Sequence, residues 1–507
     1  MISFLIALLA LVLGYMFYGK YISGVFSPET DRKTPAYELK DGVDYIPMST
    51  WKVYMIQFLN IAGLGPIFGA IMGAKFGTAS YLWIVLGTIF AGAVHDYLSA
   101  MISLRMKGAS LPEIIGKYLG QNARYVMTFF TTILMILVGA VFVSGPAELL
   151  GGMTNGLYGF DSYTWISIIF CYYIIATLCP VDEIIGRIYP FFAFCLLFMA
   201  VGIMCYLFIV QPDLPELWNS SYFVNKEWEV NPVFPMMFIT IACGAISGFH
   251  ATQSPLMARC IKNEKLGRRC FYGAMVTEGV VALIWAAAAT CFFKENGVVN
   301  PETGKAFTGA YVASTVSKEW LGVLGGILAI LGIAVAPITS GDTALRSGRL
   351  IVADFLKVDQ KSMAKRLWIA VPMFVLTAAV LIWSIEDKNG FNILWRYFAW
   401  CNQTLSVFTL WSVTVYLALH RKNYWVTFIP AMFMTCVCTS YILVAPEGFG
   451  LNYILSVSVG VVAALVCGVA FLLWKNKNKK NGKDLAENSI KSGVESAVET
   501  AMDTIVG

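Results

Sequence analysis

The chain has 507 residues, of which 58% are hydrophobic and only 13% are charged, and its formal net charge is +5. This composition excludes a soluble globular domain of this length, because apolar runs long enough to cross a bilayer recur along the chain. The positive surplus requires no nucleic-acid partner, since basic loops that face anionic lipid headgroups account for it.

Windows of about 19 residues predict thirteen membrane spans. The first span lacks a positively charged start and its apolar run continues to Lys20, so we expect a retained helix and not a cleaved signal peptide. The predicted spans are 2–25, 53–74, 78–104, 123–145, 161–179, 186–210, 234–256, 270–293, 319–343, 367–384, 393–418, 424–445 and 451–474.

The distribution of basic residues predicts an outward N-terminus and a cytoplasmic C-terminus. With this orientation most lysines and arginines lie in cytoplasmic connections and in the tail, as the positive-inside rule requires. The outward connections then carry only Lys75, Lys226, Lys294, Lys305, Lys318 and Lys388.

Two spans are interrupted by glycine and proline, at residues 63–66 and 247–255. They lie five spans apart, and an odd spacing inserts the second set of five helices upside down relative to the first. The sequence therefore predicts an all-α membrane protein with a 5+5 inverted-repeat core and two broken helices. Its predicted parts are an extra helix (1–26), two repeats (53–210 and 234–418), two C-terminal helices (424–474) and a cytoplasmic tail (475–507), with a surface helix near 490–505.

The breaks predict the substrate site of a secondary transporter. Interrupting a helix in lipid frees backbone groups that cost several kcal/mol each unless a polar partner satisfies them, so a break is tolerated where it lines a cavity. The half-helix that begins at Gly65 would present N–H groups to a substrate carboxylate, while carbonyls near Ala62 would hold a cation. Packing kinks are the alternative interpretation. The predicted substrate-binding residues are Asn60, Gly63, Leu64, Gly65, Pro66, Ser247, Gly248, His250, Thr252, Gln253, Tyr397 and Asn402.

Four ionisable residues inside the spans are further candidates, because a charge in a span is costly and usually faces the bundle interior. His250 would bind substrate, relay protons or only tie the broken backbone. Glu278, with no charge beside it in sequence, is a candidate proton carrier. Asp96 is a second candidate, with a structural ion pair as the alternative. Glu148 is a candidate for a gating residue, with a helix-terminal contact as the alternative.

Several runs of residues, in a fixed order along the chain, form a specific pattern. They are DGVDYIP (41–47), IAGLGPI (61–67), FAGAVHD (90–96), GPAELL (145–150), ACGAISGFHATQSP (242–255), PITSGDTALR (337–346) and WRYF (395–398). With these runs the chain resembles the carbon starvation protein A family of bacterial inner-membrane transporters over nearly the whole core. One departure stands before the first break, where longer members carry His-His-Phe and this chain has Ile56-Gln57-Phe58.

The resemblance implies uptake of peptides or pyruvate during carbon starvation, coupled to protons, and a leucine-transporter-type fold. In the wider superfamily of amino acid, polyamine and organocation transporters, the hydroxyls that match Thr339 and Ser340, with Asp342 nearby, would bind sodium. Sodium coupling and a non-transporting nutrient sensor are therefore the alternatives. An enzyme is not expected, since the three histidines form no catalytic motif and no phosphate-binding glycine loop is present. No cofactor or metal site is expected.

Overall fold

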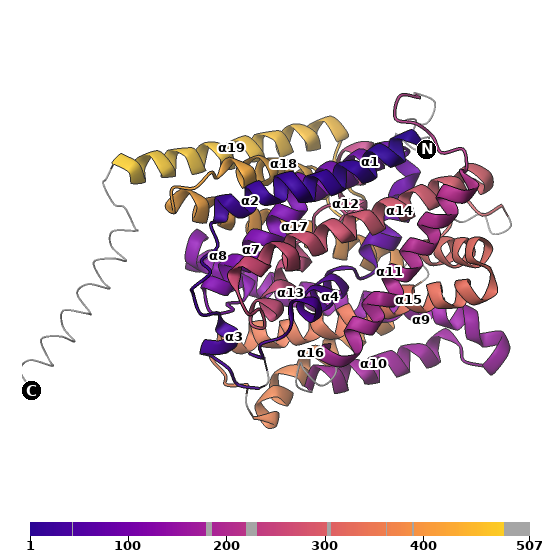
Figure 1. Ribbon diagram of the computed structural model, residues 1–507, viewed down its shortest axis with the longest axis horizontal. Helices are drawn as coiled ribbons and strands as arrows, with labels where there is room; N and C mark the ends of the chain where they lie inside the picture. Colours follow the sequence, from indigo (N-terminus) through magenta and orange to yellow (C-terminus); the bar gives the residue numbers. More distant parts are fainter. Residues whose placement is uncertain are drawn as a thin grey trace, which may run out of the picture.

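A computed structural model describes residues 1–42, 44–178, 185–219, 231–301, 306–360, 362–387 and 390–480, and these ranges are almost entirely helical (Figure 1). The first helix is continuous through α1 (Ile2–Leu13), a π-helical turn η1 (Gly14–Tyr18) and α2 (Gly19–Phe26). The first broken helix consists of α4 (Thr50–Ile61), η2 (Gly65–Gly69), α5 (Ala70–Gly73) and η3 (Ala74–Phe76), and α6 (Ala79–Gly87), η4 (Thr88–Gly92) and α7 (Ala93–Arg105) form the next.

The second broken helix consists of η6 (Val233–Met237), α12 (Phe238–Thr240) and α13 (Gly248–Ala258), followed by η8 (Arg268–Tyr272) and α14 (Gly273–Asn296). Short helical turns α3 (Pro35–Glu38), α8 (Leu111–Leu119) and η7 (Glu264–Leu266) lie in connections. The other helices are α9 (Gln121–Tyr158), α10 (Ser162–Leu178), α11 (Ile185–Val210), α15 (Gly309–Leu356), α16 (Met363–Glu386), α17 (Gly390–Leu419), α18 (Trp425–Val444) and α19 (Tyr453–Lys480).

Among the described residues, nine helices are long and apolar enough to cross a membrane, or ten if the bent first pair counts as one span. The prediction of thirteen spans exceeds this number. Three further helical segments coincide with predicted spans: α10, the broken α12–α13 pair and α17. The predicted fold class, an all-α membrane protein with two broken helices, is confirmed, although the boundaries of the two repeats stay a prediction.

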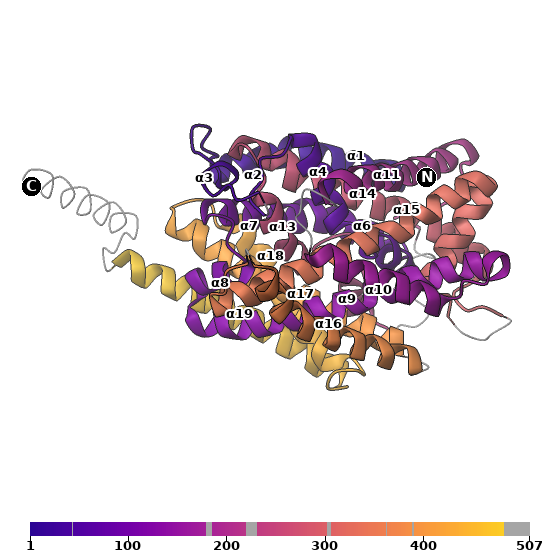
Figure 2. The ribbon, with the colours of Figure 1, turned by 90° about the horizontal axis from the view of Figure 1, so that it is seen from below.

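The two broken helices lie in the middle of the bundle. The α4 helix packs against α11, α13 and α14, and α13 packs against α7 and α17 as well as α4. The outer helices α1 and α19 lie on opposite sides in Figure 2 and expose apolar side chains, as a lipid-facing surface requires. The predicted tail begins inside α19, and the surface helix predicted within 481–507 lies outside the described residues.

The connections at one end of the bundle, where α7 and α13 finish, contain several ion pairs. Buried Glu264 accepts two bonds from Arg105, at 3.2 and 3.0 Å, and Arg259 lies 3.9 Å from Asp354. We call this the basic end.

Candidate functional site

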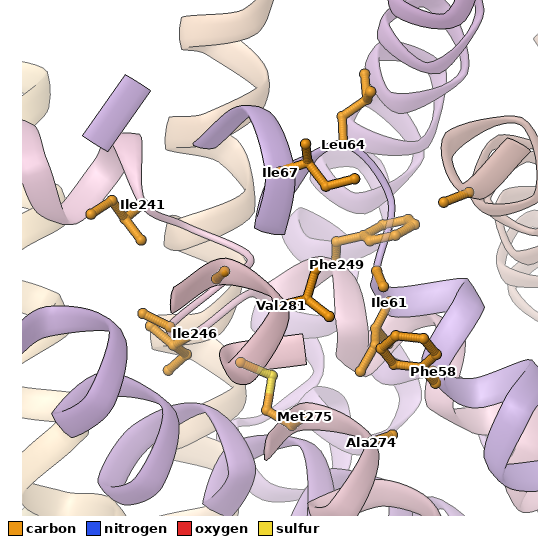
Figure 3. Close-up of a cluster of buried hydrophobic side chains, with 14 of the residues drawn as sticks. Phe58, Ile61, Leu64, Ile67, Ile241, Ile246, Phe249, Ala274, Met275 and Val281 are labelled. Carbon is orange, nitrogen blue, oxygen red and sulfur yellow. The ribbon is translucent and has the colours of Figure 1, made fainter. Parts of the chain in front are cut away.

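The first break separates α4 from η2 with a bend of 54°. Regular helix stops at Ala62 (φ −79°, ψ 46°), and the N–H groups of Ile67 and Phe68 both turn back to the carbonyl of Leu64. Apolar side chains of both broken helices and of α14 gather here (Figure 3). The interruption is therefore set within a packed core.

Gly65 makes a close contact with the second break, and its role in substrate binding stays a prediction. A Cβ atom at this position would lie 2.1 Å from Cβ of Cys243 in the second break, and one at Gly63 would lie 2.7 Å from the ring of Phe142. The two breaks thus touch each other at Gly65. Both glycines are needed because nothing larger fits between the packed segments.

The second break lies between Thr240 and Gly248, and side chains of other elements bond its backbone. Trp83 Nε1 donates to the carbonyl of Ile241 at 3.0 Å, and Thr88 Oγ1 donates to the carbonyl of Gly244 at 3.0 Å. The side-chain carbonyl of Asn402 accepts from the N–H of Phe249 at 2.6 Å and from Ser247 Oγ at 2.9 Å. Asn402 therefore caps the N-terminus of α13, the position where the sequence predicted a substrate contact.

One turn into α13, His250 joins Asp96 and Glu278 in a contiguous chain of ionisable groups. One carboxylate oxygen of Asp96 is hydrogen-bonded to Nδ1 of His95 at 2.7 Å, and the other is hydrogen-bonded to Nδ1 of His250 at 2.9 Å. On its far side, His250 Nε2 lies 3.5 Å from Glu278 Oε2. All four side chains are 0% exposed. Residues that the sequence suggested one by one are thus brought together, with His95 added.

At both ends of this chain of ionisable groups, side-chain atoms have no hydrogen-bond partner within the described structure. His250 Nε2 and both carboxylate oxygens of Glu278 have no hydrogen-bond partner, and neither has His95 Nε2. Buried polar atoms are rarely left unpaired, so such atoms are places for a bound water, a mobile proton or a ligand. The ligand atoms of Cys243, His250 and Glu278 lie within 4.8 Å of one another, a donor set that in type also suits a borderline divalent ion.

Buried amides surround the same half of α13. Gln57 Nε2 donates to Ser254 Oγ at 3.2 Å, and Ser254 Oγ donates to the carbonyl of His250 at 2.9 Å. Asn60 lies one helical turn beyond Gln57 and is fully buried, yet neither its amide nitrogen nor its oxygen has a partner among the described residues. The side-chain oxygen of Gln253 is likewise without a partner among the described residues. The unpaired atoms are thus both polar side-chain atoms of Asn60 and the side-chain oxygens of Gln57 and Gln253, whose nitrogens donate to Ser254 and Thr252.

The hydroxyls predicted to bind sodium are bonded within the protein. Thr339 Oγ1 donates to the carbonyl of Ala336 in its own helix at 2.8 Å, whereas Ser340 Oγ donates to the carbonyl of Leu59 at 2.8 Å across to α4. Asp342 accepts from Tyr172 at 2.7 Å. Thr252 similarly donates to the carbonyl of Phe249 in α13 at 2.6 Å. Of this group, Ser340 alone reaches the first break.

Two predicted residues are exposed to the surroundings of the bundle. Tyr397 is 39% exposed and donates to the backbone carbonyl of Glu447 at 3.1 Å, so the predicted substrate contact is not supported. Glu148 is an exposed residue of α9. The remaining predicted residues Leu64, Pro66 and Gly248 are buried in the two breaks.

Comparison of the sequence with known protein families identifies the family of this chain. The chain matches the family described as carbon starvation protein CstA over residues 1–150, 150–324 and 295–441. The chain belongs to the CstA family.

Curated relatives of this CstA-family chain include named transporters. A membrane protein of Haemophilus influenzae is 44% identical over 340 residues, which cover 58% of this chain and 92% of the relative. The peptide transporter CstA of Escherichia coli is 25% identical, covering 84% of this chain and 78% of the relative. The pyruvate/proton symporter BtsT of the same species is 26% identical, covering 85% and 79%. Transporter relatives agree with the prediction that the chain is not an enzyme.

Solved structures show the same fold. A manganese transporter of Eremococcus coleocola superposes with a TM-score of 0.56 at 13% identity, covering 87% of this chain and 99% of that one. MhsT in complex with L-phenylalanine gives a TM-score of 0.54 at 14% identity, covering 83% and 98%. These likenesses confirm the leucine-transporter-type fold of this CstA-family chain.

Sequence reasoning missed several residues that organise the site. Trp83 and Thr88 satisfy the second break, and His95, Cys243 and Gln57 contact predicted residues. For Gln57 and His95 a signal existed, since each is a polar or ionisable residue within an apolar helix and His95 directly precedes Asp96. For Trp83, Thr88 and Cys243 no local pattern distinguishes them from packing residues, because the partners named here lie far away in the chain.

Proposed function

We propose that this CstA-family chain is a secondary active importer that carries a small carboxylate-bearing nutrient, such as pyruvate or a short peptide, together with a proton. The observation that carries the proposal is the buried chain His95–Asp96–His250–Glu278, which links α7, α13 and α14. Relatives that transport peptides, and pyruvate with protons, support the substrate class. Uptake during carbon starvation follows from the same family membership.

The contacts suggest how one proton moves. With Asp96 ionised, each histidine donates its Nδ1–H to it, which leaves Nε2 of His250 free to accept. A protonated Glu278 then donates to that Nε2, and transfer of the proton produces a His250 cation between two carboxylates. The transfer leaves the formal charge of the group at −1, whereas loss of the proton leaves two carboxylates and a charge of −2, and charge deep in an apolar bundle is costly. The loaded and empty forms therefore differ in energy, as proton coupling requires.

Coupling to the substrate follows from the bonds that join the two sites. We place the substrate beside Asn60 and Gln57, where unpaired amide atoms can bond a carboxylate or a peptide group. Gln57 connects to the carbonyl of His250 through the hydroxyl of Ser254. A guest that draws Gln57 away from Ser254 would alter the hydrogen bonding of the residue that carries the proton.

The burial of the proposed site supports alternating access. Asn60, Gln57 and the four ionisable residues are fully buried, so a substrate reaches them only after one end of the bundle opens. We propose that the basic end faces the cytoplasm, since lysines and arginines concentrate there, and that the repeats 53–210 and 234–418 move relative to each other.

Sodium coupling is the second candidate, and one observation favours it. Ser340 Oγ and the carbonyl of Leu59 join α15 to the first break, where two oxygens face each other at 2.8 Å. Thr339 and Asp342, like Ser340, are bonded to protein groups. Proton coupling uses groups that are left unpaired, and for that reason we prefer it.

The test is uptake of labelled pyruvate, and separately of dialanine, into proteoliposomes under an imposed pH gradient without sodium. We expect accumulation of at least one substrate that collapses when the gradient is dissipated. The Glu278→Gln variant should lose gradient-driven accumulation by at least tenfold but retain exchange of labelled for unlabelled substrate, because exchange needs no net proton movement. Protein-free liposomes correct for passive entry of the acid.

The matched control is Glu295→Gln, an exposed acid near the end of the same helix, which should behave like the unaltered protein. Gradient-driven accumulation by Glu278→Gln would remove this carboxylate from the mechanism. Accumulation only with sodium would favour Ser340. Uptake of labelled Zn²⁺ or Mn²⁺ in place of either nutrient would mean that Cys243, His250 and Glu278 are ligands, and binding without uptake would indicate a sensor.

A further inference from the structure

A groove of about 630 Å³ lies on the outside of the bundle, away from the ionisable chain. The extra helix α1–η1 forms one wall through Val12 and Tyr15, the start of α4 contributes Trp51 and Tyr54, and α14 forms the other wall up to Val280. The hydroxyls of Tyr54 and Thr277 bond each other at 2.6 Å within this lining. Most of the surface that the groove presents is apolar.

The length of the groove matches one leaflet of a bilayer. Arg269 lines it at one end and Val280 at the other. Eleven helical residues at about 1.5 Å each give about 16 Å. This is close to half of a hydrocarbon core of about 30 Å. A single acyl chain that starts at the membrane surface would therefore run the length of the groove.

Basic and aromatic residues surround the opening at Arg269. Arg269 is exposed, Arg268 lies over the ring of Tyr15 at 5.3 Å, and Lys52 is half-buried next to Trp51. Trp51 is 60% exposed, as a tryptophan at the level of the headgroups would be. Throughout the described ranges, none of these three cations is in an ion pair.

We propose that the groove binds one anionic phospholipid, with its phosphate held by Arg268, Arg269 and Lys52 and one acyl chain lying between α1 and α14. Cations without an ion pair at the opening attract a negative headgroup, and an apolar groove about as long as one leaflet fits an acyl chain. The lipid would join the extra helix to the start of the first broken helix and to the helix that carries Glu278.

The experiment measures lipid binding by the full chain in detergent. Phosphatidylglycerol and phosphatidylcholine with identical chains are titrated, and bound lipid is counted by native mass spectrometry alongside the thermal midpoint. We expect phosphatidylglycerol to bind more tightly and to raise the midpoint further. Replacing both arginines (Arg268→Gln with Arg269→Gln) should weaken phosphatidylglycerol binding about thirtyfold, given about 1 kcal/mol for each charge.

The matched control is Lys262→Gln with Lys265→Gln, which removes the same charge from exposed positions in the neighbouring connection. This control should bind phosphatidylglycerol like the unaltered protein. A second variant, Val280→Trp, fills the far end of the groove without changing charge and should reduce binding of both lipids. Equal binding of the two lipids, or equal loss in the arginine and lysine variants, would overturn the proposal and indicate only general lipid contact.

Discussion

The two breaks differ in how their freed backbone groups are bonded. At the second break, side chains of α6, η4 and α17 bond these groups. At the first break, the only such bond from another helix in the described structure joins Ser340 to the carbonyl of Leu59. The second break is also next to the ionisable chain through His250. The first break has Asn60 beside it, a buried amide without a partner.

This difference suggests a division of work. Bonds from three elements hold the second break in one geometry, which keeps His250 within reach of both Asp96 and Glu278. Asn60 beside the first break keeps both polar side-chain atoms unpaired, and an unpaired buried polar group costs stability that a bound guest would restore. We therefore propose that the second break handles the proton and that the first recognises the substrate.

The largest effect on stability is expected where the two breaks touch. Gly65→Ala places a Cβ atom 2.1 Å from Cβ of Cys243, so the packed segments must move apart. Overpacking of this kind costs about 1–3 kcal/mol. Adding Cys243→Gly removes the obstructing atoms and should restore most of the thermal midpoint measured in detergent.

Gly92 provides the control for this rescue. A Cβ atom at Gly92 would lie 2.1 Å from the backbone carbonyl oxygen of Ala245. Because the obstacle is backbone, Gly92→Ala should be destabilising and Ala245→Gly should not restore it. Failure of Cys243→Gly to rescue Gly65→Ala would mean that the two breaks do not touch at this point.

A smaller loss is expected when the second break loses its cap. Asn402→Ala removes the acceptor for the N–H of Phe249 and for Ser247. Loss of an N-cap costs about 1 kcal/mol. The thermal midpoint should fall modestly, while gradient-driven uptake should fall much further because His250 lies in the turn that is capped. Thr409→Ala, whose hydroxyl bonds only within its own helix, should leave both unchanged. Equal stability of the Asn402 variant and the unaltered protein would show that the cap contributes nothing.

The sequence alone was sufficient for the fold class and for the existence of both breaks, because glycine, proline and apolar runs are local signals. It also singled out Asp96, His250 and Glu278, since an ionisable residue in a span stands out against its neighbours. It could not show that they meet, because the contact between Asp96 and His250 joins residues 154 positions apart, and Glu278 lies on a different helix from His250.

The same limit explains what the sequence missed. A glycine gives the same sequence signal whether it lines a cavity or touches a neighbouring segment, so the close contact of Gly65 with Cys243 could not be predicted. Asn402 and Tyr397 lie on one helix, but one is buried against α13 and the other is exposed near Glu447. Helical periodicity does not say which face meets which partner.

The smallest effect on stability, and the sharpest test of the division between the breaks, is expected at Asn60. Asn60→Leu replaces an unpaired amide with an apolar group of similar size, so the thermal midpoint should stay the same or rise slightly. The half-saturation concentration for uptake should nevertheless increase about tenfold, which corresponds to one lost hydrogen bond of about 1.4 kcal/mol.

Gln57→Leu is the matched comparison, because it lies one turn away and has a partner to lose. It should lower the thermal midpoint as well as weaken uptake, since Ser254 then loses its donor. If Asn60→Leu destabilised the protein as much as Gln57→Leu, Asn60 would have a structural partner in the folded state. The substrate would then have to be sought elsewhere than at the first break.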